Sequence, residues 1–393
     1  MTGKFRSPLL LYVHIPFCAH KCHYCDFNSH ERSKPEWKQY QQALIAELSH
    51  WSENPRFAGR KLSSIFFGGG TPSLAPPELI ADVIQTAEQL LGFEDNIEIT
   101  LEANPGTVDA DHFSAYRQAG VNRLSMGVQS LDDSELRWLE RIHDSRQALT
   151  AFEIARASGF DNINLDLIYG LPNQSLDQWL KSLLAAISLG TEHLSCYQLT
   201  IEPHTKLAAS HAIDPINIPD DELAIAMFTQ IRKQLAAAGL EAYEISNFAR
   251  AGLKCRHNDG YWKYHDYIGI GAGAAGKWDD WSPENPGGVT RYSNIRTPEA
   301  YIDAAIKSGE AINSRESLTK QQAAAEAVWV GLRRSHGINR RDFKDRFDAD
   351  LRELFFDELS PWLKQGCLAL NEQQLCLTES GLLLADAIAE SVL

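Results

Sequence analysis

Apolar runs of six to nine residues recur through the first half of the chain, separated by longer amphipathic segments. The runs are nearly continuous and rich in β-branched and aromatic residues, which is typical of parallel strands covered on both faces. They lie at residues 9–17, 63–69, 96–104, 123–128, 162–170 and 193–201. The pattern therefore predicts six strands of one parallel sheet.

The segments between these runs have helical spacing, and several begin near a proline or end at a glycine. Four of these predicted helices are residues 35–51, 76–91, 144–159 and 176–190. Strands that alternate with helices indicate an α/β fold, in which helices connect parallel strands.

The second half of the chain is less regular. Residues 220–239 predict another helix, and residues 243–278 are rich in aromatic residues and glycine. The last segment combines helices with a strand–turn–strand at 363–381, an order that suits a winged-helix-like module. We expect three domains, at residues 1–205, 206–310 and 311–393.

Polar or glycine-rich residues stand at the ends of five consecutive predicted strands. In chain order these are three cysteines from Cys18 on, the run GGGTP at 68–72, Glu102, Gln129 and Asp166. Because the carboxyl ends of parallel strands meet at one edge of a sheet, we expect a single shared site there.

The formal net charge of −15 disfavours binding to nucleic acid. No apolar run approaches the ~20 residues needed to cross a bilayer, and the N-terminal apolar stretch is typical of a buried strand rather than a signal peptide. We therefore expect a cytoplasmic protein, in which cysteines stay reduced and serve as ligands or core residues.

The cysteines have the spacing Cys18-x3-Cys22-x2-Cys25. Three thiolates could bind zinc with a nearby histidine as the fourth ligand, and Cys22 and Cys25 could form a redox pair. They could also hold a [4Fe–4S] cluster in which one iron has no protein ligand. The candidates for the fourth zinc ligand are His14, His20, His23 and His30.

The cysteine spacing, the glycine run 68–70 and the strand-end pattern resemble the radical S-adenosylmethionine (SAM) superfamily. The resemblance implies a partial (β/α)6 barrel over about residues 8–205, followed by a smaller, mostly helical, winged-helix-like C-terminal domain. It also implies a [4Fe–4S] cluster on Cys18, Cys22 and Cys25, SAM on the open iron, and an electron donor for the cluster.

Longer segments are similar to the oxygen-independent coproporphyrinogen III oxidase family, and most to its heme chaperone branch. They are LYVHIPFCAHKCHYCDF, FFGGGTPS, LEANPG, GVQSLDDSELRWLERIHD, NLDLIYGLP and CRHNDGYWKYHDYIGIGAGAAG. This branch implies heme as a ligand and heme-accepting proteins as partners, and leaves open whether the chain forms a homodimer.

The resemblance assigns SAM contacts residue by residue. The positions are Tyr12, Tyr24, Gly69, Gly70, Thr71, Glu102, Gln129, Arg141, Asp166 and Thr200. Each has an ordinary alternative: Arg141 could be a surface cation, and the two carboxylates could cap backbone amides.

Two departures disfavour the oxidase. Its motif carries a fourth cysteine where this chain has Phe27, and we expect no room for its longer N-terminal segment ahead of the first strand. The chaperone branch carries an H-N-x-x-Y-W loop, present here from His257 to Trp262.

By resemblance, His257 is the heme-linked residue, with Tyr261, Trp262, Tyr264 and Tyr267 as flat faces for the porphyrin. The alternatives are a hydrogen-bonded loop histidine, or Cys255 as a second ligand. A nearby G-x-G-x-x-G run, from Gly271 to Gly276, lies outside a βαβ unit and predicts close backbone packing rather than a dinucleotide site.

Overall fold

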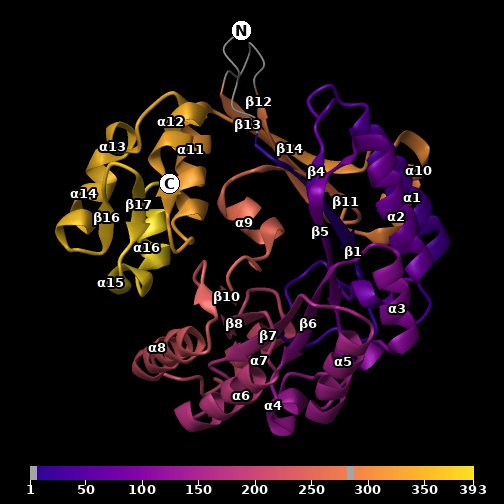
Figure 1. Cartoon of the computed structure of the whole chain (residues 1–393), viewed down its shortest axis with the longest axis horizontal. Coiled ribbons are helices and arrows are strands. Elements are labelled where there is room, and N and C mark those ends of the chain that lie inside the picture. The colour runs from indigo at the N-terminus through magenta and orange to yellow at the C-terminus, as the bar shows by residue number, and fades with distance from the viewer. Residues whose placement is uncertain (1–6, 281–286) are drawn as a thin grey trace.

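The computed structural model describes residues 7–280 and 287–393. Six parallel strands form the centre of a curved sheet in the order β1-β4-β5-β6-β7-β8 (Figure 1). Their bounds are Leu9–Ile15, Leu62–Gly69, Phe93–Ala103, Arg123–Gln129, Ile163–Tyr169 and His193–Gln198. All six strands predicted from the sequence are confirmed.

Later segments extend this sheet at both edges. β11 (Asp266–Ile270) pairs in parallel with β1, and an antiparallel meander of β12 (Ala275–Asp280), β13 (Gly288–Asn294) and β14 (Ile312–Leu318) continues from it. The other edge gains β10 (Asn247–Ala249) and β9 (Glu241–Ala242). The strands of residues 241–318 therefore extend the sheet at both edges.

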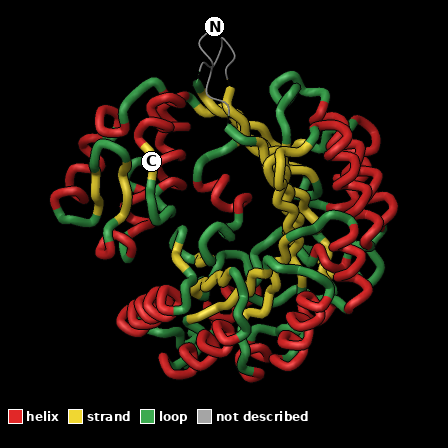
Figure 2. The backbone as a smooth tube through the Cα atoms, viewed as in Figure 1, coloured by secondary structure: helices red, strands yellow, loops and turns green. Residues whose placement is uncertain are grey.

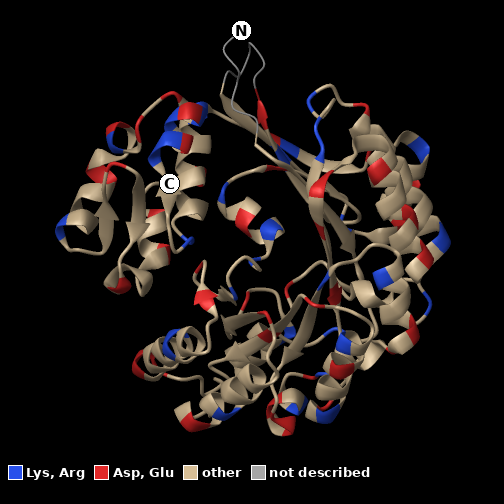
Figure 3. Ribbon diagram, in the orientation of Figure 1, with Lys and Arg blue, Asp and Glu red and all other residues tan. Residues whose placement is uncertain are grey.

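Helices cover the convex face of the sheet (Figures 1 and 2). The predicted helices are confirmed as α1 (Trp37–Ser52), α2 (Pro77–Leu91), α5 (Ser145–Ala157), α6 (Leu176–Ser188) and α8 (Asp221–Ala237). Shorter elements complete the layer and its loops: η1 (Pro72–Leu74), η2 (Pro105–Thr107), α3 (Ala110–Gln118), α4 (Asp133–Trp138), α7 (Lys206–Ile213) and α10 (Pro298–Ser308). Charged residues lie on these outer helices and on the C-terminal domain as well as in loops (Figure 3).

The remaining residues form the C-terminal domain, which has its own core. It contains α11 (Lys320–Gly331), β15 (Ile338–Asn339), α12 (Arg340–Phe347), α13 (Leu351–Leu354), α14 (Phe356–Lys364), β16 (Leu368–Leu370), β17 (Gln374–Leu377), α15 (Glu379–Leu382) and α16 (Ala385–Glu390). The helices and the β16–β17 pair match the expected mostly helical, winged-helix-like module.

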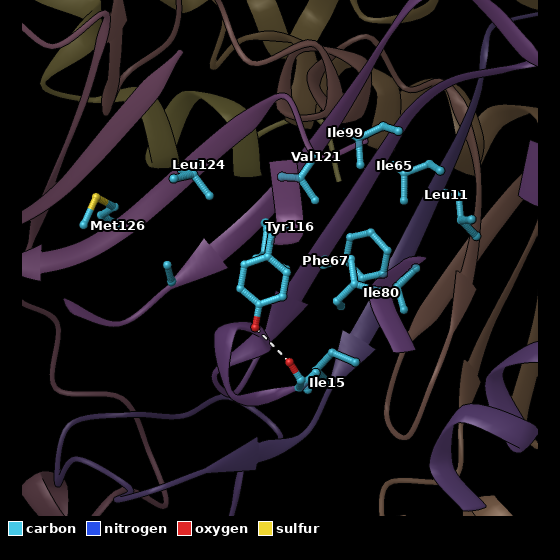
Figure 4. Packing of buried hydrophobic residues seen from close by; sticks show 14 of the residues in the cluster. Leu11, Ile15, Ile65, Phe67, Ile80, Ile99, Tyr116, Val121, Leu124 and Met126 are labelled. Atoms are coloured by element: carbon cyan, nitrogen blue, oxygen red, sulfur yellow. Dashed lines mark hydrogen bonds between the residues drawn. The ribbon is translucent and has the colours of Figure 1, made fainter. Parts of the chain in front are cut away.

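The main core lies between the sheet and the outer helices. Ile65, Phe67 and Ile99 of the strands pack near Ile80 of α2 (Figure 4). In the same core, the buried Tyr116 of α3 donates its hydroxyl hydrogen bond to the Ala75 carbonyl oxygen at 2.8 Å. The helices thus cover the residues at every second position of the strands.

The other face of the strands is polar, so the interpretation of strands with two apolar faces was wrong. Inward positions alternate with the core positions, as expected from the two-residue period of a strand. They include Ser64, Phe66, Glu98, Thr100, Glu102, Arg123, Ser125, Asn164, Asp166, His193 and Ser195. The inner wall of the curved sheet therefore offers hydrogen-bonding groups to whatever lies inside it.

We predict that Phe67→Ala lowers the free energy of unfolding by about 3–5 kcal/mol, because it leaves a cavity in a fully buried core. Urea denaturation would measure the loss. Leu90→Ala on α2 is the control: Leu90 is 42% exposed, so its change should stay within about 0.5 kcal/mol. Equal losses in the two variants would contradict this assignment of the core.

Candidate functional site

A cavity of about 680 Å³ lies on the inner side of the curved sheet. Its wall combines the loops that follow β1 and β4 with inward residues of β5 to β8. Twelve of the fourteen predicted site residues line it: Cys18, Cys22, Tyr24, Cys25, Gly69, Gly70, Thr71, Glu102, Gln129, Arg141, Asp166 and Thr200. The fold thus brings residues that lie at or near the carboxyl ends of five strands, together with Asp166 in the middle of β7, into one space.

The three cysteines lie on a loop tied down by a short parallel pair, β2 (Phe17–Cys18) and β3 (His30–Glu31). All three thiols are free. The Cys18 sulfur accepts a hydrogen bond from Thr71 Oγ1 at 3.5 Å, and the Cys22 sulfur accepts one from Arg141 Nη1 at 3.6 Å. Burial raises the pKa of the Cys18 thiol, because the thiolate is poorly solvated there. A bound metal cation would stabilise the thiolate and offset this effect.

The described side chains around the thiols do not form a ligand set for a single metal ion. In the described part of the chain, no three His, Cys, Asp or Glu side chains are grouped so as to hold one metal ion. In an iron–sulfur cluster, by contrast, each thiolate binds a different iron, so three cysteines need only line the same cavity.

Three of the four histidines considered as a fourth zinc ligand have other partners, whereas Nε2 of the fourth, His30, is buried without a hydrogen-bond partner. His14 bonds through Nε2 to the Asn28 carbonyl oxygen at 2.9 Å. His20 and His23 face the Glu140 carboxylate at 3.4 and 3.7 Å. These contacts further weaken the zinc interpretation.

Bare backbone forms the wall beside the cysteines. A Cβ atom at Gly69 would lie 2.5 Å from the His14 ring, and one at Gly70 would lie 2.8 Å from the Phe17 carbonyl oxygen. Gly69 also has a φ of +118°, a backbone angle that residues with a side chain rarely adopt. Only glycine fits this close approach, which leaves backbone groups open to the cavity.

Two carboxyl groups face the cavity from β5 and β7, the strands on either side of β6. Glu102 accepts a hydrogen bond from the Gly69 N–H at 3.0 Å, and burial, assisted by the charge of Asp166, raises the pKa of Glu102 to about 8. Asp166 accepts hydrogen bonds from Ser125 Oγ at 3.2 Å and Asn164 Nδ2 at 2.8 Å. Glu102 is therefore poised to change charge near neutral pH when a cation binds.

Arg141 is not a surface cation. Its guanidinium donates to the Gly127 carbonyl oxygen at 2.7 Å and to the Cys22 sulfur, which holds it in the cavity wall. Gln129 nearby has a φ of +69° at a register shift between β6 and β7. Such local strain in a non-glycine residue is typical of functional sites. Thr200 is exposed at the cavity wall.

Tyr12 and His257 do not line the cavity. Tyr12 packs on Phe66 and bonds through its hydroxyl to His14 Nδ1 at 3.0 Å. His257 has no exposed surface, and both ring nitrogens are occupied, by Ser64 Oγ and by the Tyr261 hydroxyl, each at 2.9 Å. In this conformation His257 therefore has no free nitrogen for a heme iron.

The H-N-x-x-Y-W segment forms a short helix, α9 (Arg256–Trp262), so the prediction of a loop was wrong. The helix lies inside the curve of the sheet (Figure 1). The Glu98 carboxylate holds its first turn by accepting from the N–H groups of Arg256 at 2.9 Å and His257 at 3.1 Å. Asn258 and Trp262, rather than His257, line the cavity.

Cys255 and the three glycines of the G-x-G-x-x-G run are packing residues. The buried Cys255 thiol donates to Glu98 Oε1 at 3.4 Å and does not line the cavity. A Cβ at Gly271, Gly273 or Gly276 would lie within 2.4 Å of a neighbouring atom. The expected close packing is confirmed, although none of the three glycines lines the cavity.

The sequence analysis missed the polar end of the cavity near the start of the strands. Its residues are Arg123, Ser125, Asn164, Ser195 and Asn247. The signal was present as a polar residue at every second position of the strands from 123 to 198. We overlooked it because the intervening residues are strongly apolar.

Comparisons with known proteins agree with this geometry. Residues 12–186 match the radical SAM superfamily, and residues 318–384 match the HemN C-terminal domain. The chain is 39% identical to the heme chaperone HemW of Haemophilus influenzae, over 98% of this chain and 97% of that protein. It is 37% identical to HemW of Escherichia coli, over 98% and 97%.

Two further relatives are informative. The chain is 35% identical to the mitochondrial radical S-adenosyl methionine domain-containing protein 1 of Bos taurus, over 100% of this chain and 90% of that protein. Among solved structures, coproporphyrinogen III oxidase (HemN) of Escherichia coli is similar with a TM-score of 0.82 and 25% identity, over 99% and 91% of the two chains. Within the described residues, no helix is long and apolar enough to cross a membrane.

We predict that His257 is structural. His257→Ala should lower the free energy of unfolding by about 2–4 kcal/mol, because the Ser64 and Tyr261 hydroxyls lose a buried partner and a cavity forms. Urea denaturation of the cofactor-free protein measures this, with the exposed His336→Ala as control. Unchanged stability together with lost heme binding would instead support a ligand role.

Proposed function

The chain belongs to the radical SAM superfamily and, within it, to the HemW family of heme chaperones, and on this basis we propose that it binds a [4Fe–4S] cluster, SAM and heme and delivers heme to target proteins. The observation that carries the proposal is the single cavity in which three free cysteines meet bare glycine backbone and two buried carboxyl groups.

The donor set supports a cluster held by Cys18, Cys22 and Cys25. Three thiolates leave one iron open to an exchangeable ligand, and when bound the cluster supplies the electron that breaks the sulfonium bond of SAM. The Arg141 guanidinium beside Cys22 would stabilise the negative charge of the thiolates.

The neighbouring residues suit SAM. The open backbone of Gly69 and Gly70 leaves room for its amino acid part, and Glu102 and Asp166 can accept hydrogen bonds from ribose hydroxyls or an ammonium group. Tyr12 would act indirectly, by orienting His14 beneath Gly69.

Heme enters the proposal through the relatives named heme chaperone, and Trp262 offers it a flat apolar surface in the cavity wall. The likeness to HemN makes coproporphyrinogen oxidation the second candidate. Phe27 disfavours it, because this residue, 60% exposed at the cavity wall, occupies the position where the oxidase motif carries a cysteine.

We predict that the anaerobically reconstituted protein binds hemin saturably and forms no protoporphyrinogen from coproporphyrinogen III in the presence of SAM and a reductant. A Soret titration and a porphyrin assay by chromatography test the two parts. If the protein does not bind hemin, the chaperone proposal is refuted. If it forms protoporphyrinogen, the oxidase function is favoured.

The assignment of the cluster to Cys18, Cys22 and Cys25 is tested by replacing all three with Ala. Cys367→Ala in the C-terminal domain is the control. The triple variant should lose iron, sulfide and SAM binding, while Cys367→Ala keeps all three. Zinc without sulfide in the wild type would contradict the cluster.

We also predict that SAM binding releases a proton from Glu102. Because the free carboxyl has a pKa of about 8, it is protonated below that pH, and the positive charge of SAM favours the ionised form. SAM affinity should therefore rise with pH up to about 8 and then level off. Anaerobic calorimetry measures this, and Glu102→Gln should flatten the profile; an unchanged slope would refute the role of Glu102.

A further inference from the structure

Arg123 is a buried cation that faces the cavity without an ion-pair partner. It begins β6, is 2% exposed and lines the cavity wall. Its Nε has no hydrogen-bond partner, and no carboxylate of residues 7–280 or 287–393 forms an ion pair with its guanidinium. A charge buried in this way is costly unless a counter-charge reaches it.

The acidic side chains nearest to Arg123 accept hydrogen bonds from other donors. Glu98 uses both carboxylate oxygens on the first turn of α9 and on the Cys255 thiol. Asp166 accepts from Ser125 and Asn164. Glu102, whose ionised form the charge of Arg123 also favours, accepts from the Gly69 N–H. Burial alone would lower the pKa of Arg123, but the neighbouring acidic groups outweigh it, so the guanidinium stays charged.

SAM at the cluster is poorly placed to supply the missing anion. Arg123 and Gln129 stand at opposite ends of β6, six residues apart, or about 20 Å along a strand. The strand register places Phe67 of β4 level with Leu101 of β5 and Leu124 of β6, so Gly69 lies three residues beyond the level of Arg123, or about 10 Å along the strands. A SAM carboxylate held at the glycine loop is therefore separated from Arg123 along the strands.

The helix that carries the H-N-x-x-Y-W segment lies close to Arg123. Glu98 and Cys255 lie near Arg123, and Glu98 holds the first turn of α9. Asn258 and Trp262 of α9 line the same cavity as Arg123. The cavity thus offers both a flat indole and an unpaired guanidinium, a combination that suits an aromatic ligand bearing a carboxylate.

We propose that Arg123 binds a propionate carboxylate of the porphyrin, so that the acidic edge of the ligand lies at the β6 start of the cavity rather than at His257. The inference rests on the proposed function, because it assumes that a porphyrin enters this cavity. A guanidinium binds a carboxylate through two parallel hydrogen bonds, which supplies both charge and orientation.

The test compares hemin with hemin dimethyl ester, which lacks the carboxylates but keeps the iron and the ring. The full-length, cluster-loaded protein is titrated with each under the same anaerobic conditions. Wild type should bind hemin at least about tenfold more tightly than the ester, and Arg123→Gln should lose that preference while binding the ester and SAM as before. Arg123→Lys should keep part of the preference, and Arg117→Gln on the outer helix α3 should change nothing.

The outcomes separate the two hypotheses. If wild type binds neither compound, the proposed function fails. If wild type binds both equally, or if Arg123→Gln weakens both to the same extent, the role of Arg123 is overturned while heme binding stands. If Arg123→Gln does not fold, wild type and Arg123→Lys are compared instead. An equal affinity of wild type for the two compounds, or an undiminished preference for hemin in Arg123→Lys, would then overturn the role of Arg123.

Discussion

The main constraint on this structure is that polar side chains buried on the inner face of the curved sheet must form hydrogen bonds, because a buried polar group without a partner costs free energy. Side chains alternate along each strand, so the same segments that place Phe67 or Leu124 in the core also place Phe66 or Ser125 inside. The inward polar residues must find partners, and most find them in one another. Asn164, for example, connects Ser125, Asp166 and His193 in a single buried network.

The same constraint explains the position of the helix α9. A short helix leaves unpaired N–H groups at its start, and inside the sheet there is little water to satisfy them. The Glu98 carboxylate supplies the acceptors, and Ser64 and Tyr261 satisfy the ring of His257. Both ring nitrogens of His257 are therefore used in hydrogen bonds that fix the helix, whereas Asn258 and Trp262 line the cavity.

The C-terminal domain is joined to the sheet by a buried cluster of charges. Asp266 pairs with Arg60 at 2.7 Å and with Lys277 at 3.6 Å, and Arg346 of α12 pairs with Asp279. On the inner side, Trp262 borders the main cavity and also two smaller cavities of about 260 and 120 Å³ lined by residues of this domain. Trp262 is thus the residue through which the domain adjoins the cavity.

The sequence alone determined the six parallel strands, most of the covering helices and the cysteine and glycine loops, because local periodicity and turn residues specify them. It also brought twelve site residues to one cavity, since most of them lie at or near strand ends that meet there. It did not determine which residues of β9 to β14 extend the sheet, that residues 256–262 are helical, or that His257 is closed off. Only the tertiary structure decided these, because they depend on partners far along the chain, such as Glu98 for α9 and Ser64 for His257. The unpaired state of Arg123 is likewise a property of the folded chain, in which every nearby carboxylate is turned to another donor.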